Sequence, residues 1–412
     1  MNRNLMKPMA LLGTLILILS LMIGCGGDPA AAVTEATAAP TETVGTISGE
    51  TSVFTDAAEA AESNGPAIPG LTFKETVPLQ YAQCFQLYRY EGGYTLVRIL
   101  EDADYLVVPE GAVVPEGLDA EIVVLQQPLN KIYLAATSAM SLFDAVGALD
   151  HIRLTGTQKS GWYIDAAVTA MEKGDILFAG KYSEPDYERL IDEECDLAIE
   201  STMIYHTPKV KEMIQDLGIP VLVDRSSYEN HPLGRTEWIK LHAALVGKEA
   251  EAEAFFARQA DIIVQLQGFE NTGKTVAFFF VNSDGSVVVR KPTDYIPQMI
   301  QLAGGRYAFE DMQTDQTATS ISITMENFYA TAVEADVLIY NASIDAPIES
   351  MDELLAKNSL FADFKAVKEG NVWCTGKTFY QATDIVGEMI RDIHLVLTGG
   401  SANDMTFLTH VS

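Results

Sequence analysis

The sequence predicts an α/β protein of two lobes, each with a parallel-type central sheet, joined by a single long helix and preceded by a disordered tether. Strand-like apolar runs alternate with helical segments from residue 131 onward, an order typical of parallel sheets covered on both faces. This alternation breaks at one long helical segment, 249–267. Residues 26–70 hold seven acidic residues, no Lys or Arg and one aromatic residue, too little apolar surface to drive ordering.

Charge and composition narrow the function classes. The 412 residues include 57 Asp+Glu against 27 Lys+Arg, a formal charge of −30, and 48% are hydrophobic. The apolar content excludes a wholly disordered chain. The acidity argues against nucleic-acid binding and against adhesion to anionic lipid, because both need clustered Lys and Arg.

The N-terminus predicts a signal peptide over residues 1–24. Arg3 and Lys7 precede an apolar run, 9–23, that is too short to span a bilayer. Residues 21–25, Leu-Met-Ile-Gly-Cys, resemble a bacterial lipobox, from which only Met22 departs. The resemblance implies lipidation of Cys25 and an extracytoplasmic protein held at the cell membrane by this anchor alone, with 25–70 as lipidated Cys and flexible linker. The alternatives are an ordinary secretory peptide and a membrane anchor whose Cys is incidental.

The other three cysteines are predicted to be free thiols. Cys84, Cys195 and Cys374 form no CxxC motif and are odd in number once Cys25 is set aside. A body of this size does not need a disulfide framework.

The first lobe is expected over residues 71–246. Short alternating runs separated by Gly- and Pro-containing turns predict an antiparallel extension over 71–127. Strands are then expected at 132–136, 152–156, 196–200 and 219–223, and helices at 139–149, 208–217 and 236–246.

The connecting helix is placed within 247–270, and the second lobe over 271–412. Strands are expected in the second lobe at 275–281, 335–340 and 371–374, and helices at 294–304, 361–367 and 383–397. The two lobes share a repeated sequence pattern. In the first lobe Glu188 opens a helix that leads to a strand starting at Asp196, and in the second Glu326 leads in the same way to Asp336.

A series of short motifs, each weak by itself, occurs in a characteristic order: 133–139, 179–181, 185–190, 196–199, 217–221, 231–240, 247–252, 302–305 and 364–372. In this order the chain resembles the helical-backbone class (class III) of ABC-importer substrate-binding proteins, which serve iron–siderophore, haem and cobalamin uptake. The resemblance covers roughly residues 128–400, whereas 72–127 have no counterpart in the plainest members. It implies a cleft between the lobes and limited closure about a rigid helix.

The resemblance also implies a function. The expected protein is a monomeric, non-enzymatic binding protein without a cofactor, which captures a metal chelate, first of all an iron–siderophore, and delivers it to an ABC importer permease dimer. Haem or cobalamin is the alternative cargo. Surface hydrolase and surface receptor or adhesin are the competing classes, and the sequence has no GxSxG elbow, P-loop or GxGxxG motif to support an enzyme.

The ligand site is expected where parallel strands end, because ligands bind beyond the carboxyl ends of such strands. Aromatic rings there can stack on a chelate, and Arg can neutralise an anionic one. The residues predicted to line the cleft are Trp162, Tyr163, Tyr205, Arg225, Tyr228, Arg290, Tyr295 and Tyr380. The alternative is that these aromatic residues pack their own loops and the cations stay at the surface.

No metal site is predicted, because the six His form no HxH or HExxH motif. If haem is the cargo, Tyr205 or His206 could be an axial ligand. His231 lies in a turn, where a structural hydrogen bond is expected instead.

Two glutamates are the predicted docking residues. By the resemblance, one exposed Glu in each lobe pairs with Arg on the permease, and Glu188 matches the first-lobe position. Glu326 is the second-lobe match, with Glu334 as a rival because of unequal spacing to the following strand. A helix-start Glu stabilised by the helix dipole is the alternative for both.

Overall fold

A computed structural model describes residues 65–313 and 319–412 of the chain. Residues Ala57–Ser412 form one compact unit. The predicted signal peptide, Cys25 and nearly all of the predicted tether lie outside the described residues. Within the described part of the chain, no helix is long and apolar enough to cross a membrane.

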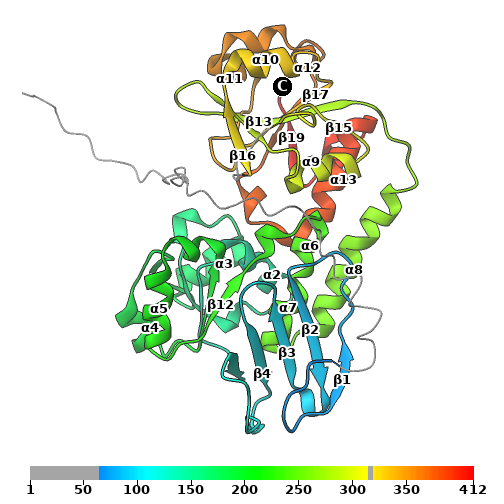
Figure 1. Ribbon diagram of the computed structural model, residues 1–412. Helices are drawn as coiled ribbons and strands as arrows, with labels where there is room; N and C mark the ends of the chain where they lie inside the picture. The colour runs from blue at the N-terminus through cyan, green and yellow to red at the C-terminus, as the bar shows by residue number, and fades with distance from the viewer. Residues whose placement is uncertain (1–64, 314–318) are drawn as a thin grey trace, which may run out of the picture. The chain divides into compact units, whose positions relative to one another are not determined.

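The N-terminal extension is a five-stranded sheet in the order β1-β2-β3-β4-β5 (Figure 1). Its strands are β1 (Phe73–Thr76), β2 (Phe85–Tyr90), β3 (Thr95–Ile99), β4 (Asp104–Val108) and β5 (Ile122–Gln126). The first four are antiparallel, as predicted, but β5 runs parallel to β4. The reason is the long connection 109–121, which brings the chain back to the N-terminal end of β4 before β5 begins.

The first lobe has the predicted parallel sheet, in the order β12-β11-β6-β7-β8. Its strands are β6 (Ile132–Leu134), β7 (Ile152–Thr155), β8 (Leu177–Phe178), β11 (Leu197–Ser201) and β12 (Val221–Asp224). Both faces are covered, as β11 illustrates: Leu197 and Ile199 point into the main core, and Ala198 points into a second cluster on the opposite face. The covering helices are α2 (Met140–Ala145), α3 (Asp165–Lys173), α4 (Tyr187–Asp192) and α5 (Pro208–Asp216).

Three helices follow the first lobe: α6 (Pro232–Glu237), α7 (Ile239–Val246) and the long α8 (Glu249–Leu266). The helix predicted at 249–267 is therefore confirmed, and the one predicted at 236–246 is two helices. Residues Ala252, Phe256, Ala260 and Ile263 form a buried stripe along α8. In Figure 1, α8 rises from beside α7 to the second lobe.

The second-lobe sheet is mixed rather than purely parallel. Its order is β16-β14-β13-β17-β18-β19, with β15 also paired to β13. The strands are β13 (Thr275–Val281), β14 (Val287–Arg290), β15 (Arg306–Tyr307), β16 (Ser320–Ile323), β17 (Val337–Tyr340), β18 (Val372–Thr375) and β19 (Leu408–His410). The central β13, β17 and β18 pair in parallel, whereas β14 is antiparallel to both β13 and β16, and β19 is antiparallel to β18. The Asp284-Gly285 turn explains the first difference, because it closes β13 and β14 into a hairpin.

The second-lobe helices are α9 (Tyr295–Leu302), α10 (Met325–Ala332), α11 (Met351–Lys357), α12 (Lys365–Lys368) and α13 (Val386–Thr398). Helix α13 approaches α8 closely at Gly387, where a Cβ atom would lie 2.7 Å from the Gln259 carbonyl oxygen. One main hydrophobic core, with buried residues from Val77 to Val411, therefore continues through this helix pair into both lobes.

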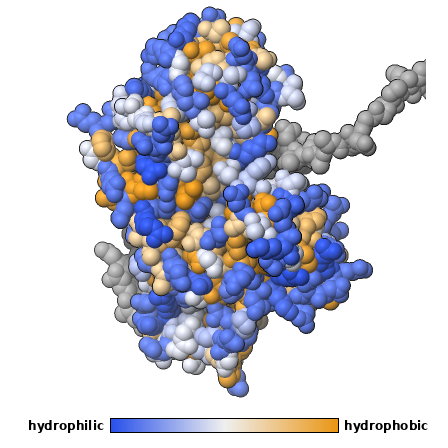
Figure 2. Space-filling view, turned by 180° about the vertical axis from the view of Figure 1, so that it is seen from behind, coloured by the Kyte–Doolittle hydropathy of each residue, from blue (hydrophilic) through white to orange (hydrophobic). Residues whose placement is uncertain are grey.

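Much of the surface is polar, as the many acidic residues of the sequence lead us to expect. Figure 2 shows a face that is mostly hydrophilic, with hydrophobic residues gathered in small patches. Cys84, Cys195 and Cys374 are free thiols, as predicted, and the last two are buried.

Candidate functional site

The two lobes meet through the loops that follow their strands. Gln381, after β18, accepts a hydrogen bond from the Tyr163 amide (2.8 Å) and donates one to the Gly161 carbonyl (2.7 Å). Deeper in, the buried Thr236 hydroxyl in α6 donates to the Thr383 carbonyl (2.7 Å). These contacts join the carboxyl ends of strands from both sheets, the place where parallel-sheet proteins bind ligands.

A pocket of about 120 Å³ lies between the lobes. One wall is a first-lobe loop, which we call the pocket loop, and the other wall follows β14 in the second lobe. The lining residues are Ser227, Tyr228, Glu229 and Asn230 of the pocket loop, and Lys291, Thr293, Asp294, Tyr295 and Thr319 of the second lobe. Of the residues predicted to line the cleft, Tyr228 and Tyr295 are brought together here.

The second-lobe wall is built on an ion pair. The Arg290 guanidinium bonds to both Asp294 carboxylate oxygens (3.0 and 2.7 Å), and Asp294 also caps α9 by accepting from the Ile296 amide (3.1 Å). The Tyr380 hydroxyl accepts from Arg290 (3.3 Å) and from the Asn341 amide group (3.0 Å). Arg290 and Tyr380, both predicted to line the cleft, therefore belong to one hydrogen-bonded cluster, and much of its bonding capacity is satisfied internally.

Arg235 was not among the predicted site residues. Its guanidinium carbon lies 4.2 Å from the centre of the Tyr295 ring, a cation–π contact across the lobe boundary. Arg235 sits in α6, not in a loop at a strand end, so reasoning from strand ends could not find it. The sequence does not predict Gln381 as a site residue either, because an uncharged side chain in a loop carries no sequence signal.

Arg225 differs from its prediction because it is buried. It is 7% exposed, donates to the Leu100 carbonyl and pairs with Glu101 (2.8 Å), both in the turn between β3 and β4. Its guanidinium carbon lies 5.0 Å from the Tyr228 ring centre. Arg225 thus supports the half-exposed Tyr228 ring rather than facing the space between the lobes.

Trp162 also differs from its prediction. It is 3% exposed, and its indole N–H donates to the Thr157 carbonyl (3.2 Å), so it packs its own loop. The neighbouring Tyr163 is exposed, with its ring centre 5.7 Å from the Lys377 ammonium nitrogen. Tyr205 is exposed too, and burial of its hydroxyl, together with the nearby Asp102 carboxylate, raises the pKa of Tyr205 to about 12.

His231 makes the structural hydrogen bond that its position in a turn predicts. The His231 Nδ1 accepts from the Leu233 amide (3.1 Å), and its ring stacks on Tyr81 with ring centres 4.3 Å apart. His206 is exposed beside Tyr205. Within residues 65–313 and 319–412, no group of three or more His, Cys, Asp or Glu side chains is arranged to hold a metal ion.

The two predicted docking glutamates occupy equivalent positions. Glu188 is the second residue of α4 and Glu326 is the second residue of α10, and both are exposed. Each helix leads to an Asp that accepts from a backbone amide at the start of the neighbouring strand: Asp196 from Lys131 (2.9 Å) and Asp336 from Thr275 (2.8 Å). The repeated pattern in the sequence thus corresponds to a structural repeat.

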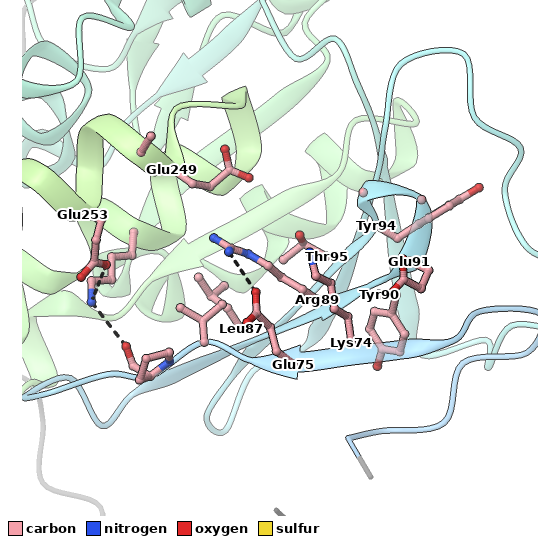
Figure 3. Close-up of a pocket in the computed structure, with 16 residues that line it drawn as sticks. Lys74, Glu75, Leu87, Arg89, Tyr90, Glu91, Tyr94, Thr95, Glu249 and Glu253 are labelled. Atoms are coloured by element: carbon pink, nitrogen blue, oxygen red, sulfur yellow. Dashed lines mark hydrogen bonds and ion pairs between the residues drawn. The ribbon is translucent and has the colours of Figure 1, made fainter. Parts of the chain in front are cut away.

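A larger cavity, of about 660 Å³, lies away from the lobe boundary. Figure 3 shows it between the N-terminal sheet and the first turns of α8. Two ion pairs lie in its lining, Arg89 with Glu75 (3.2 Å) and Lys240 with Glu253 (3.0 Å). Since this cavity involves no carboxyl end of a parallel strand and no second-lobe residue, it is not the candidate ligand site.

Known proteins resemble the chain in sequence. A family model described as periplasmic binding protein matches residues 135–378. One uncharacterized lipoprotein of Methanocaldococcus jannaschii is 27% identical over 297 residues, covering 68% of this chain and 68% of the relative. A second from the same organism is 25% identical over 340 residues, covering 78% of this chain and 84% of the relative.

Solved structures share the fold. A periplasmic binding protein from Veillonella parvula has 14% identity and a TM-score of 0.54, over 77% of this chain and 98% of that chain. The periplasmic heme-binding protein HutB of Vibrio cholerae has 16% identity and a TM-score of 0.53, over 65% and 98%. The family model covers more than half of the 412 residues, and α8 joins two sheets of the expected type. The chain therefore belongs to the periplasmic binding protein family, in the helical-backbone class of ABC-importer substrate-binding proteins.

Proposed function

We propose that this protein captures a metal chelate, first of all an iron–siderophore, between its lobes and delivers it to an ABC importer permease. The observation that carries the proposal is the inter-lobe pocket, where Tyr228 and Tyr295 stand on opposite walls at the ends of two sheets. Haem and cobalamin are the alternative cargoes. Solved relatives of the same fold include a possible iron-binding protein of Staphylococcus epidermidis and the heme-binding protein of Vibrio cholerae.

The chemistry of the walls favours a flat or anionic chelate. Tyrosine rings offer apolar faces for stacking. Arg235 supplies a positive charge against the Tyr295 face, and no acidic partner of Arg235 is found within the described residues. A local cation can attract an anionic cargo even though the chain as a whole is strongly acidic.

Cargo entry requires the lobes to separate. Ligand pockets usually measure about 300–1,000 Å³, whereas this one measures about 120 Å³. At its rim the lobes are held by the two hydrogen bonds of Gln381 and by the contact of Lys377 with Tyr163. A small rotation about α8 that breaks these contacts would enlarge the pocket, and closure over the cargo would restore them.

A thermal-shift screen with ferric siderophores, haemin and cyanocobalamin tests the proposal. A ligand present at about 100 times its Kd stabilises the folded state by about 2.7 kcal/mol, which gives a clear rise in midpoint. A rise with one class of chelate supports the proposal and names the cargo. Unchanged midpoints with all three classes would count against a chelate-binding function.

Permease docking through Glu188 and Glu326 gives the second prediction. Both side chains project from matching helix starts, and Glu334, which follows the end of α10, does not share that position. Reversing both charges, Glu188→Arg with Glu326→Arg, should lower uptake by at least about tenfold, because like charges across an interface cost several kcal/mol. Chelate affinity should stay unchanged. The matched control Glu334→Arg should transport normally, and normal uptake by the double variant would refute docking.

Anchoring through Cys25 is the third prediction. The two archaeal relatives are named lipoproteins, and two acyl chains suffice for stable membrane attachment. Cys25→Ser should move the protein from the membrane fraction to the soluble fraction of fractionated cells. The control Cys84→Ser, which changes a free thiol of the folded body, should stay in the membrane fraction. Retention of the Cys25→Ser variant there would contradict lipid anchoring.

A further inference from the structure

Five consecutive backbone amides of the N-terminal extension donate hydrogen bonds to two buried carboxylates. These amides belong to residues 80–84, which link β1 to β2 and which we call the amide strap. The Glu237 carboxylate, 0% exposed, accepts from Gln80 (2.9 Å), Tyr81 (2.7 Å) and Ala82 (2.9 Å). Charged acceptors make stronger hydrogen bonds than neutral ones, so this carboxylate is a firm attachment.

The second carboxylate of this attachment is Glu229, which is 4% exposed. It accepts from the amides of Gln83 (2.8 Å) and Cys84 (2.9 Å), and from the Trp238 indole N–H (2.9 Å). Glu229 also belongs to the pocket loop between the lobes. The amide strap therefore holds a residue that lines the candidate ligand pocket.

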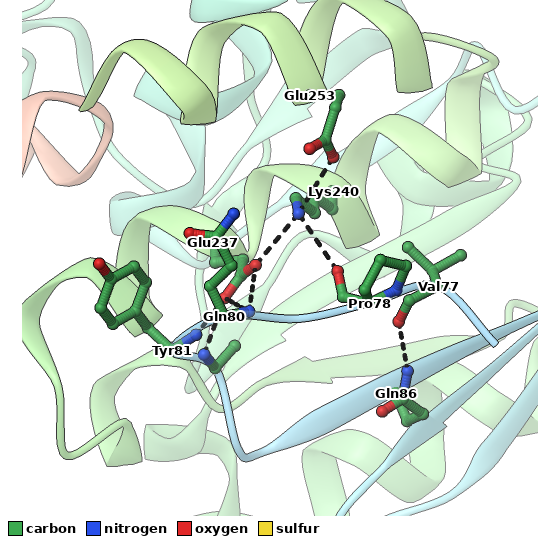
Figure 4. A network of polar contacts seen from close by, with 9 residues as sticks. Val77, Pro78, Gln80, Tyr81, Gln86, Glu237, Lys240 and Glu253 are labelled. Carbon is green, nitrogen blue, oxygen red and sulfur yellow. Dashed lines mark hydrogen bonds and ion pairs between the residues drawn. The ribbon is translucent and has the colours of Figure 1, made fainter. Parts of the chain in front are cut away.

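Lys240 extends the attachment to the connecting helix (Figure 4). Its ammonium nitrogen lies 3.1 Å from a Glu237 oxygen and 3.0 Å from a Glu253 oxygen of α8, and it donates to the Pro78 carbonyl (3.3 Å). Lys240 itself is 4% exposed. The N-terminal sheet, α7 and α8 are thus joined at one buried ammonium group.

The segment between Glu229 and Glu237 carries contacts to the second lobe. Arg235 stacks on Tyr295, and Thr236 donates to the Thr383 carbonyl. On the side of the strap, His231 stacks on Tyr81. This short stretch of chain is therefore held by the amide strap at both ends, and it touches the opposite lobe close to its Glu237 end.

We propose that the N-terminal sheet is a clamp that positions the inter-lobe pocket, with Glu229 and Glu237 as the positioning residues. The clamp gives residues 71–127 a role in cargo binding, although most of the sheet lies away from the pocket. The contacts above imply that the clamp keeps the pocket loop ordered. The effect of the clamp on cargo affinity rests on the proposed function.

The test replaces both carboxylates in the full chain, Glu229→Gln with Glu237→Gln. An amide group keeps the shape of the side chain but loses the charge and one acceptor oxygen. Backbone hydrogen exchange is measured well below the thermal midpoint. We expect exchange at least about tenfold faster in the amide strap and also in the pocket loop, with strand β13 unchanged. The chelate that most stabilises the wild-type protein in the screen should bind at least about tenfold more weakly.

Two controls separate positioning from general destabilisation. Glu75→Gln removes an exposed carboxylate from the same sheet and should behave as wild type. Phe361→Leu, in the second-lobe aromatic cluster, lowers the midpoint without touching the clamp. It should leave exchange in the pocket loop unchanged and the chelate affinity within about twofold of wild type.

Faster exchange in the amide strap with wild-type exchange in the pocket loop would overturn the proposal, because the sheet would then be only an attached module. Equal losses of affinity in Phe361→Leu and the double variant would overturn it too. If the double variant does not fold, Glu229→Gln alone gives the same comparison. If no chelate binds the wild-type protein, the proposed function fails, and the exchange measurement still decides the clamp.

Discussion

Replacing His242 with leucine should lower the free energy of unfolding by about 3–5 kcal/mol, the usual cost of leaving a buried carboxylate without its partner. The His242 Nε2 lies 3.0 Å from the Asp224 Oδ2, and the two side chains are 0% and 2% exposed. Burial raises the pKa of Asp224, but the hydrogen bonds from His242 and Ser226 outweigh it, so the pKa is lowered overall. Without His242 a carboxylate would remain buried with only Ser226 as a partner.

Urea unfolding at neutral pH measures this cost. The double variant Asp224→Asn with His242→Leu is the control, because it removes the charge as well as its partner and should recover part of the lost stability. The position also matters for the site, since Asp224 ends β12 and accepts from the Ser226 amide (2.8 Å) directly before the pocket loop. A loss below about 1 kcal/mol in His242→Leu would show that the pair contributes little.

Glu200 should make the protein less stable as the pH rises from about 5 to 8. This residue of β11 is 0% exposed, and neither carboxylate oxygen has a hydrogen-bond partner within the described residues. Burial raises the pKa of Glu200 to about 8. In the unfolded chain the pKa is about 4.3. Between these values the folded state binds the extra proton, so stability is fully present below the lower value and is lost as the pH rises toward the upper one.

Comparison with Glu200→Gln isolates this effect from the pH dependence of the other charges. The variant cannot titrate at this position, so its stability relative to wild type should increase by about 3 kcal/mol from pH 5 to pH 8, at up to about 1.4 kcal/mol per pH unit. Urea unfolding of both proteins at pH 5, 6.5 and 8 provides the measurement. A difference between them that stays constant over this range would show that Glu200 does not hold a proton in the folded state.

Much of the fold could be predicted because local pattern and tertiary structure agree. The long apolar stripe of α8 and the strand–helix alternation of the first lobe are periodic signals, and both are confirmed. Strand direction was harder to predict. The parallel pairing of β5 and the β13–β14 hairpin depend on how connections return along a sheet, and apolar runs carry no information about that.

The candidate site could be predicted only in outline. The loops after the strands do converge, and Tyr228 and Tyr295 share a pocket. Residue type alone does not separate exposed side chains from buried ones, so the sequence predicts Trp162 and Arg225 in the cleft although both pack against loops. Glu229 and Glu237 gave no signal, because their partners are backbone amides about 150 positions away in the sequence.

The location of the cargo is the central claim, and isothermal titration of the best chelate against matched tyrosine variants tests it most directly. Tyr228→Ala and Tyr295→Ala remove rings from the inter-lobe pocket, and Tyr94→Ala removes one from the larger cavity beside α8. Aromatic stacking contributes about 0.5–1.5 kcal/mol beyond the area that the ring buries, so each inter-lobe variant should bind at least about threefold more weakly, while Tyr94→Ala should bind as wild type does. Wild-type affinity in both inter-lobe variants, with a loss in Tyr94→Ala, would contradict the claim and place the cargo in the larger cavity.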